Sequence, residues 1–352
     1  MRYVDSRPNT GDMRLIEELT KEIFTPEGFP VSFRLDGKKH RGIPAGWRTE
    51  RSFTYSDARF TDGTVTAEDP ETGLRLRAEY RVYRDFPMAE WVLYLENGGS
   101  ENSPQVTELL SLDASLPLSE ADLRWCNGDE IEQGTAGYET FTEKLTEQPF
   151  VLSPGGGRPC SKAFSYFRLL TKDTSAVLAV GWPGTWKAEF SALDGKTAVK
   201  IGQKTTDFFL RPGETVRTPK ITLMALRGGE VRAINLWRRF YNDHLLPRDD
   251  GKALAPMTYF SGVTPKELED VFTCCTRISE EEIFRSADTL RENGIFPDVL
   301  WLDAGWYKPL PGYEYNWIPV GSWEPRKDNF PHGMKAVSDE LHKRGIRLLL
   351  WF

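Results

Sequence analysis

The sequence has few cysteines and histidines, and none is spaced as a metal site requires. The four cysteines, Cys126, Cys160, Cys274 and Cys275, contain no C-x-x-C pair, and the four histidines form no ligand spacing. The adjacent pair Cys274 and Cys275 is also poorly placed for a normal disulfide. We therefore expect no bound metal and no cofactor.

The chain also lacks a long apolar run and an excess of positive charge. Its first residues contain no apolar core of signal-peptide length, and no window approaches the roughly 18 apolar residues of a membrane span. The net charge of -7 argues against a nucleic-acid partner, which would need a basic face. These absences predict a soluble, cytoplasmic protein without a membrane or nucleic-acid partner.

Aromatic residues, in contrast, are abundant, with 11 Trp, 12 Tyr and 20 Phe among 352 residues. Aromatic side chains fill cores first, and they also stack on the apolar C–H faces of sugar rings. The composition is therefore compatible with a carbohydrate site but does not establish one. The length allows two domains.

The first 228 residues have the pattern of β-structure. Residues 74–83 alternate apolar and polar side chains, which is typical of a half-buried antiparallel strand. Further strands are predicted at 90–95, 176–180, 186–190, 198–201, 207–210 and 220–225. Turn signals such as Asp194-Gly195 lie between them. This spacing predicts an antiparallel β-sandwich over residues 1–228.

The pattern changes after Gly228-Gly229. Apolar residues then recur at three- and four-residue spacing, at Ile234, Trp237, Tyr241 and Leu245. This period predicts an amphipathic helix over residues 230–244, followed by a polar connection. We assign residues 229–253 to a helical linker.

Residues 254–352 alternate between strand and helix patterns. The predicted strands are 256–260, 296–303 and 347–352, and the predicted helices are 279–292 and 334–343. Ser279 and Glu282 have the spacing of a helix-starting capping box. Strand–helix–strand order indicates right-handed parallel crossovers. A complete (β/α)8 TIM barrel takes ~250 residues, so this segment predicts the first three strands of such a barrel.

Three motifs in this last part carry chemistry. The first is W-L-D-A-G-W-Y at residues 301–307, the second runs from residue 320 through 325 to 330–335, and the third is L-W-F at residues 350–352. In this order and spacing they resemble glycoside hydrolase family 36, the α-galactosidase-like members of the melibiase clan. The resemblance is specific in these motifs and diffuse before Gly228.

The resemblance implies sugar-binding roles for four residues. Asp303 matches the strand-end acid that accepts hydrogen bonds from hydroxyls of the terminal galactose, and Trp351 matches the tryptophan that lines the galactose pocket. Trp306 and Trp323 match aromatic residues near the same mouth. Each residue also has a structural interpretation, as a solvated strand-end carboxylate or as a packing aromatic.

The sequence departs from the family at Ala304, where a second acidic residue is common. One hydroxyl contact is therefore lost or supplied elsewhere, which leaves the sugar specificity open.

The resemblance further implies retaining hydrolysis of terminal α-galactosides, with an α-galactoside as the binding partner. The intact parent could form a homo-oligomer. A retaining glycosidase needs a nucleophile and an acid/base ~5 Å apart, and the family places both after later barrel strands. We therefore expect residues 1–352, truncated within the barrel, to lack catalytic residues and to be inactive alone.

Three alternatives stay open. One is a galactosyl transglycosylase of the same family. The second is a non-catalytic carbohydrate-binding protein in which the sandwich recognises the sugar. The third is an assembly role, since sandwiches of this family can pack against neighbouring subunits.

Overall fold

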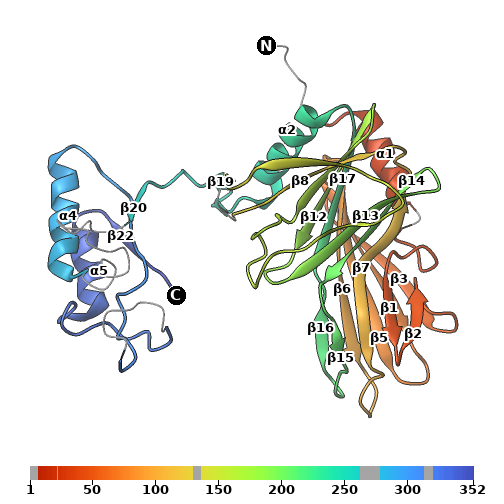
Figure 1. The fold of residues 1–352 in the computed structure, drawn as a ribbon, viewed down its shortest axis with the longest axis horizontal. Helices are drawn as coiled ribbons and strands as arrows, with labels where there is room; N and C mark the ends of the chain where they lie inside the picture. Colours follow the sequence, from red (N-terminus) through yellow and green to blue (C-terminus); the bar gives the residue numbers. More distant parts are fainter. Residues whose placement is uncertain (1–6, 22, 130–135, 262–277, 313–319) are drawn as a thin grey trace. The chain divides into compact units, whose positions relative to one another are not determined.

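The computed structural model describes residues 7–21, 23–129, 136–261, 278–312 and 320–352. The chain separates into two compact units, Met1–Leu246 and Pro247–Phe352. The first contains nearly all of the antiparallel β-structure, and the second contains a small parallel sheet with helices (Figure 1). Cys274 and Cys275 lie outside the described residues.

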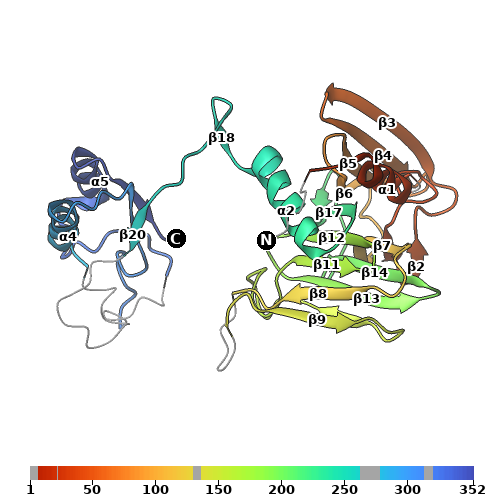
Figure 2. The same cartoon turned by 90° about the horizontal axis from the view of Figure 1, so that it is seen from above.

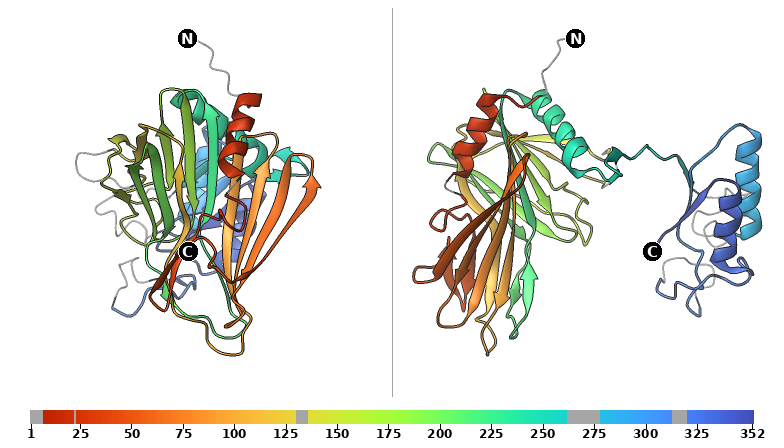
Figure 3. Two further views of the ribbon diagram at one scale, coloured as in Figure 1. Left: turned by 90° about the vertical axis from the view of Figure 1, so that its right-hand side faces the viewer. Right: turned by 180° about the vertical axis from the view of Figure 1, so that it is seen from behind.

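The first unit is a β-sandwich of two antiparallel sheets, which Figure 3 shows from two sides. The smaller sheet has seven strands in the order β10-β13-β14-β7-β1-β2, with β15 also paired to β7. These strands are β1 (Ser32–Leu35), β2 (Lys38–Arg41), β7 (Val106–Leu116), β10 (Phe150–Leu152), β13 (Trp186–Leu193), β14 (Lys196–Gln203) and β15 (Asp207–Phe208).

The larger sheet has ten strands in the order β3-β4-β5-β6-β17-β12-β11-β8-β9, with β16 paired to β6. They are β3 (Arg48–Asp57), β4 (Phe60–Glu68), β5 (Leu74–Tyr83), β6 (Met88–Asn97), β8 (Asp122–Cys126), β9 (Thr140–Lys144), β11 (Tyr166–Leu170), β12 (Thr174–Gly181), β16 (Thr215–Arg217) and β17 (Lys220–Arg227). The strand predicted at residues 74–83 is confirmed as β5, and those predicted at 90–95, 176–180, 186–190, 198–201 and 220–225 fall inside longer strands. The strand predicted at 207–210 is shorter than expected, because β15 ends at Phe208.

The core of this unit lies between the two sheets. Alternate residues of each strand point inward, so that Trp91, Phe167, Trp186 and Phe190 are almost completely buried. The Trp91 indole N–H donates to the main-chain oxygen of Ser111 at 2.8 Å, which satisfies its polar group inside the core.

The structure also contains a helix in this region that the sequence analysis did not predict, α1 (Thr10–Thr20). Its start is marked by a reciprocal capping box between Asn9 and Asp12. Leu15, Ile16 and Leu19 project from the helix into the sandwich core. The apolar stripe covers barely two turns, which is why periodicity alone gave a weak signal.

The predicted helix over residues 230–244 is confirmed, but its last turn is different. It consists of α2 (Glu230–Phe240) followed by a π-helical turn, η1 (Tyr241–Leu245). Figure 2 shows α2 lying beside β12 and β17 of the larger sheet. Its buried residues Ala233, Leu236 and Phe240 pack against the outer face of that sheet, away from the main core.

The second unit begins with a short hairpin of β18 (Arg248–Asp249) and β19 (Lys252–Ala253). A sheet of three parallel strands follows, β20 (Tyr259–Ser261), β21 (Val299–Leu302) and β22 (Arg347–Leu350). Helices α4 (Glu280–Glu292) and α5 (Gly333–Lys343) lie between the strands in sequence. The predicted parallel order is confirmed, although each strand is shorter than the apolar run that predicted it.

Helices α4 and α5 cover one face of this sheet. Ile283 of α4 and Leu341 of α5 pack with Leu300 and Leu302 of β21 in a separate small core. On the opposite face Tyr259 is 62% and Leu349 is 51% exposed.

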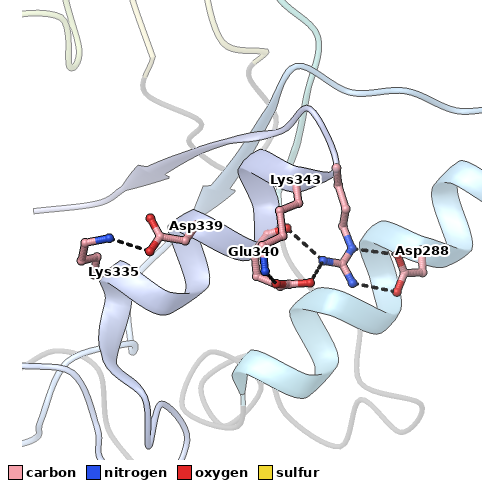
Figure 4. Close-up of polar contacts among 6 residues, drawn as sticks. Asp288, Lys335, Asp339, Glu340 and Lys343 are labelled. Carbon is pink, nitrogen blue, oxygen red and sulfur yellow. Dashed lines mark hydrogen bonds and ion pairs between the residues drawn. The ribbon is translucent and has the colours of Figure 1, made fainter.

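Ion pairs hold the two helices together (Figure 4). Arg344 donates to both carboxylate oxygens of Asp288 on α4, at 2.8 and 3.1 Å, and to the side chain of Glu340 on α5 at 2.7 Å. The Arg344 guanidinium lowers the pKa of the Asp288 carboxyl group through these hydrogen bonds. Ser279 caps α4 by accepting a hydrogen bond from the Glu282 main-chain N–H, which confirms the predicted start of the helix and one of the two hydrogen bonds of a capping box.

Candidate functional site

The carboxyl ends of the parallel strands bring two of the four candidate residues to one edge of the sheet. Asp303 directly follows β21, and Trp351 directly follows β22. Leu302 and Leu350, the last residues of these strands, lie opposite each other, and the Trp351 N–H donates to the Leu302 oxygen at 3.0 Å. The register therefore places Asp303 and Trp351 beside each other, as expected for neighbouring parallel strands.

Asp303 presents its carboxylate to solvent. Its side chain is exposed, and Oδ1 accepts a hydrogen bond from the Ala304 N–H at 2.7 Å, which orients the carboxylate at the end of the strand. A solvated carboxylate fixed in this way can accept further hydrogen bonds from hydroxyl groups of a ligand.

Ala304 is 5% exposed, and the next residue, Gly305, has a φ of 98°, which favours glycine. The chain therefore turns sharply after Asp303 and carries the side chain of residue 304 into the protein. A carboxylate at position 304 would need a different local packing, so the departure from the family pattern agrees with the observed burial.

The three candidate tryptophans meet in one aromatic cluster. The Trp306 ring centroid lies 6.2 Å from that of Trp323, and the Trp323 centroid lies 6.1 Å from that of Trp351. Tyr307 and Phe352 complete the cluster, at 5.2 Å from Trp323 in both cases. Neither residue had a predicted role. Their positions in the motifs, directly after Trp306 and Trp351, could have indicated that they belong to the cluster.

The three tryptophans differ in exposure, and this separates what each can do. Trp306 is 2% exposed, and its indole N–H donates to the Trp351 oxygen at 3.0 Å. Trp323 and Trp351 are half-buried. In this structure Trp306 is therefore enclosed by protein and supports the cluster, whereas Trp323 and Trp351 retain accessible ring surface.

Main-chain pairing brings Trp323 to the strand ends. Tyr307 and Pro325 form an antiparallel bridge, the Lys308 N–H donates to the Glu324 oxygen at 2.6 Å, and the Arg326 N–H donates to the Trp306 oxygen at 3.0 Å. Trp323 itself has a φ of 50°, a left-handed conformation that is uncommon outside glycine. Such a conformation persists only where the surrounding contacts fix it.

Motif residues around α5 have structural positions. Phe330 is 2% exposed within the small core, and His332 Nδ1 lies 2.6 Å from a side-chain oxygen of Glu280, which links the start of α5 to α4. This stretch forms the turn into α5.

Within the described ranges, no group of three or more His, Cys, Asp or Glu side chains has a metal-binding arrangement. Among these residues, no helix is long and apolar enough to cross a membrane.

No protein-family model matches the chain. A probable α-galactosidase C of Aspergillus terreus is 21% identical over 295 residues, which is 77% of this chain and 37% of that protein.

Solved structures of family 36 α-galactosidases share the fold. AgaA of Geobacillus stearothermophilus is 16% identical with a TM-score of 0.69, and AgaB of the same organism is 15% identical with a TM-score of 0.71. Each match covers 92% of this chain and 45% of the solved chain. An α-galactosidase of Lactobacillus brevis is 16% identical, with a TM-score of 0.67 over 92% of this chain and 44% of its own.

The resemblance to glycoside hydrolase family 36 is confirmed at the level of the fold, because the structural matches cover both units of the chain. The chain spans less than half the length of these relatives.

Proposed function

We propose that the chain is the N-terminal part of a family 36 glycoside hydrolase, and that the whole protein hydrolyses terminal α-galactosides with retention. The observation that carries the proposal is the convergence of Asp303, Trp323 and Trp351 at the carboxyl ends of parallel strands. Active sites of strand–helix barrels lie at this end of the strands. The α-galactosidase fold of the solved relatives supports the same conclusion.

The fold supports a proposed domain organisation. In it, residues 1–228 are the sandwich domain, residues 229–253 are the linker between the two domains, and residues 254–352 are the first three strands of a (β/α)8 barrel. The open face with Tyr259 and Leu349 then belongs to the barrel interior, where apolar side chains from several strands pack in layers. The boundary between the compact units, after Leu246, falls inside the proposed connection.

We propose an α-galactoside as the substrate. Variants of AgaA have been solved with 1-deoxygalactonojirimycin, stachyose and raffinose. In this chain Asp303 would accept hydroxyl hydrogen bonds, and the half-buried rings of Trp323 and Trp351 would contact the apolar face of the sugar. Trp306 would hold the other two rings in position. With alanine at position 304, one hydroxyl contact is expected to be missing.

The chemistry itself requires further residues. Retaining hydrolysis needs two carboxyl groups ~5 Å apart on either side of the scissile bond. We propose that both lie after later barrel strands, so that residues 1–352 alone bind sugar weakly and do not hydrolyse it.

The test compares variants of the whole protein on 4-nitrophenyl α-galactoside. Asp303→Asn should lower kcat/KM by about 10–100-fold, because a hydrogen bond to a charged group contributes about 1.5–3 kcal/mol. Asp339→Asn, which changes an exposed carboxylate of α5, should stay within about threefold of the unchanged protein. Full activity of Asp303→Asn would show that this carboxylate does not bind the substrate. Absence of α-galactosidase activity in the whole protein would reject the proposed reaction.

A further inference from the structure

A second concave surface lies in the first unit. It is a groove of about 750 Å³ between α2–η1 and the outer face of the larger sheet, beside β11, β12 and β17. All of its lining residues belong to the first unit. The volume falls within the range of small-molecule sites, which is about 300–1,000 Å³.

Three aromatic rings form much of the apolar lining. Trp237 of α2 lies 5.2 Å from Tyr166 of β11 and 5.8 Å from Tyr241 of η1, and both pairs are inclined by 52°. Tyr241 is 46% exposed and Trp237 is half-buried. The three rings are therefore inclined to one another, and Tyr241 and Trp237 leave part of their apolar surface accessible at the groove.

The π-helical turn contributes to this arrangement. An α-helix has about 3.6 residues per turn, and the wider turn of η1 changes the direction of the side chains that follow Phe240. Phe240 is fully buried against the sheet, while Tyr241, Leu245 and Leu246 remain 46%, 40% and 48% exposed at the groove.

Three cations line the same groove, Arg168, Lys220 and Arg238, and the first two are paired with carboxylates inside the molecule. Lys220 Nζ lies 2.7 Å from Glu90 Oε2, and the Arg168 guanidinium donates to Glu230 Oε1 at 2.8 Å. Asn242 adds an amide. The ion pairs neutralise the charges but keep oxygen and nitrogen atoms available for further hydrogen bonds.

From these observations we propose that the groove is a carbohydrate-binding site for a neutral oligosaccharide, separate from the strand-end site. Sugars combine apolar C–H faces, which stack on aromatic rings, with hydroxyl groups, which hydrogen-bond to paired charges and amides. An anionic ligand would favour an uncompensated cationic cluster, whereas two of the three cations that line this groove, Lys220 and Arg168, are already paired with carboxylates. The proposal does not depend on the proposed function, because all lining residues lie outside the strand-end site.

The experiment titrates residues 1–352 with raffinose, maltotriose and cellotriose, by calorimetry and by tryptophan fluorescence. At least one trisaccharide should bind at or below about 1 mM. Tyr241→Ala should weaken its binding about tenfold or more, because it removes an accessible ring, whereas Tyr241→Phe should retain most of the affinity. Retention by the phenylalanine variant separates ring stacking from a loss of fold.

Two controls locate the binding. Val231→Ala changes a 59% exposed residue of the same helix that does not line the groove, and should bind as the unchanged chain does. With maltotriose or cellotriose, which carry no α-galactosyl group, Trp351→Ala alters only the strand-end cluster and should also leave this binding intact. Ala179→Leu fills the groove from β12 and should abolish it.

Three results would overturn the proposal. They are no binding of any of the three sugars up to about 10 mM, equal binding by Tyr241→Ala, and loss of binding in Trp351→Ala alone. Light scattering that shows a dimer of the unchanged chain and a monomer of Tyr241→Ala would assign the groove to self-association instead.

Discussion

The two units use their β-sheets in opposite ways. In the first unit, antiparallel strands bury their inner faces in a shared core, and α2 covers part of the outer face of the larger sheet. In the second unit, α4 and α5 cover one face of a three-stranded parallel sheet, and the other face leaves Tyr259 62% and Leu349 51% exposed.

This difference agrees with the physics of the two sheet types. An antiparallel sheet can keep one face in water, and the alternating patterns of β4 and β5 show this. Parallel sheets are normally covered on both faces. The first unit therefore has the packing of a complete domain, whereas the second has an apolar face that requires a covering surface. The proposed barrel would supply that surface.

The largest expected effect concerns a buried ion pair in the first unit. The Asp12 side chain is fully buried, and Arg232 donates to its two oxygens at 2.9 and 2.6 Å. The Arg227 N–H donates to it as well, at 2.9 Å. Asp12→Ala would leave Arg232 without its partner carboxylate in a protected position, and should lower the free energy of unfolding by about 3–5 kcal/mol. Urea denaturation followed by circular dichroism measures this loss.

The matched change in the second unit is Asp339→Ala. Asp339 pairs with Lys335 on the surface of α5, where the side chains are 55% and 86% exposed, so we expect less than about 0.5 kcal/mol. Equal effects of the two alanine variants would show that burial does not determine the strength of these pairs.

Core truncation tests whether the units are independent. Leu178 of β12 and Leu300 of β21 are both fully buried, and replacing either with alanine should cost about 2–5 kcal/mol. We expect Leu300→Ala to accelerate amide hydrogen exchange in β20–β22 and to leave exchange in β12 and β17 unchanged. Leu178→Ala should accelerate exchange in β12 and β17 and leave exchange in β20–β22 unchanged. If either variant accelerated exchange in both sheets equally, the division into two stability units would be wrong.

The smallest effect is a dependence on pH in the second unit. Asp298, just before β21, accepts hydrogen bonds from the main-chain N–H and the hydroxyl of Thr258, at 2.7 and 2.9 Å. These hydrogen bonds lower the pKa of Asp298 in the folded chain. The pKa of Asp298 is therefore lower in the folded chain than in the unfolded chain. Its contribution to the free energy of unfolding is present above the unfolded pKa and is lost as the pH falls through the folded pKa.

Asp298→Asn should therefore reduce the fall in urea midpoint between about pH 5 and pH 2.5. Thr258→Val should reduce the same part of the dependence, and the double variant should add little to either change. An acid dependence identical in all four proteins would exclude this hydrogen-bonded pair as its source.

Much of the first unit was predictable because strand patterns are local. The alternation in residues 74–83 identified β5 correctly, since a half-buried strand needs only a two-residue period. Helix α1 was missed because its apolar stripe is short. Its N-terminal capping box, Asn9 with Asp12, was a usable signal.

The candidate site was predictable only in part. Strand ends placed Asp303 and Trp351 together, because parallel strands in register align their carboxyl ends. Exposure was not predictable. Trp306 and Trp323 had the same predicted role near the mouth of the site, yet one is enclosed and the other is half-buried.

The sequence by itself determined some of the strands of the first unit, the helix after Gly229, and the helices and parallel order of the second unit, because residue periodicity and turn chemistry act over a few neighbours. The tertiary structure decided which side chains meet. The pairing of residues 306–308 with 324–326 brought Trp323 to Trp351, and the π-helical turn after Phe240 opened the groove beside Tyr241. Such contacts join residues distant in sequence or depend on a single irregular turn, and no local pattern specifies them.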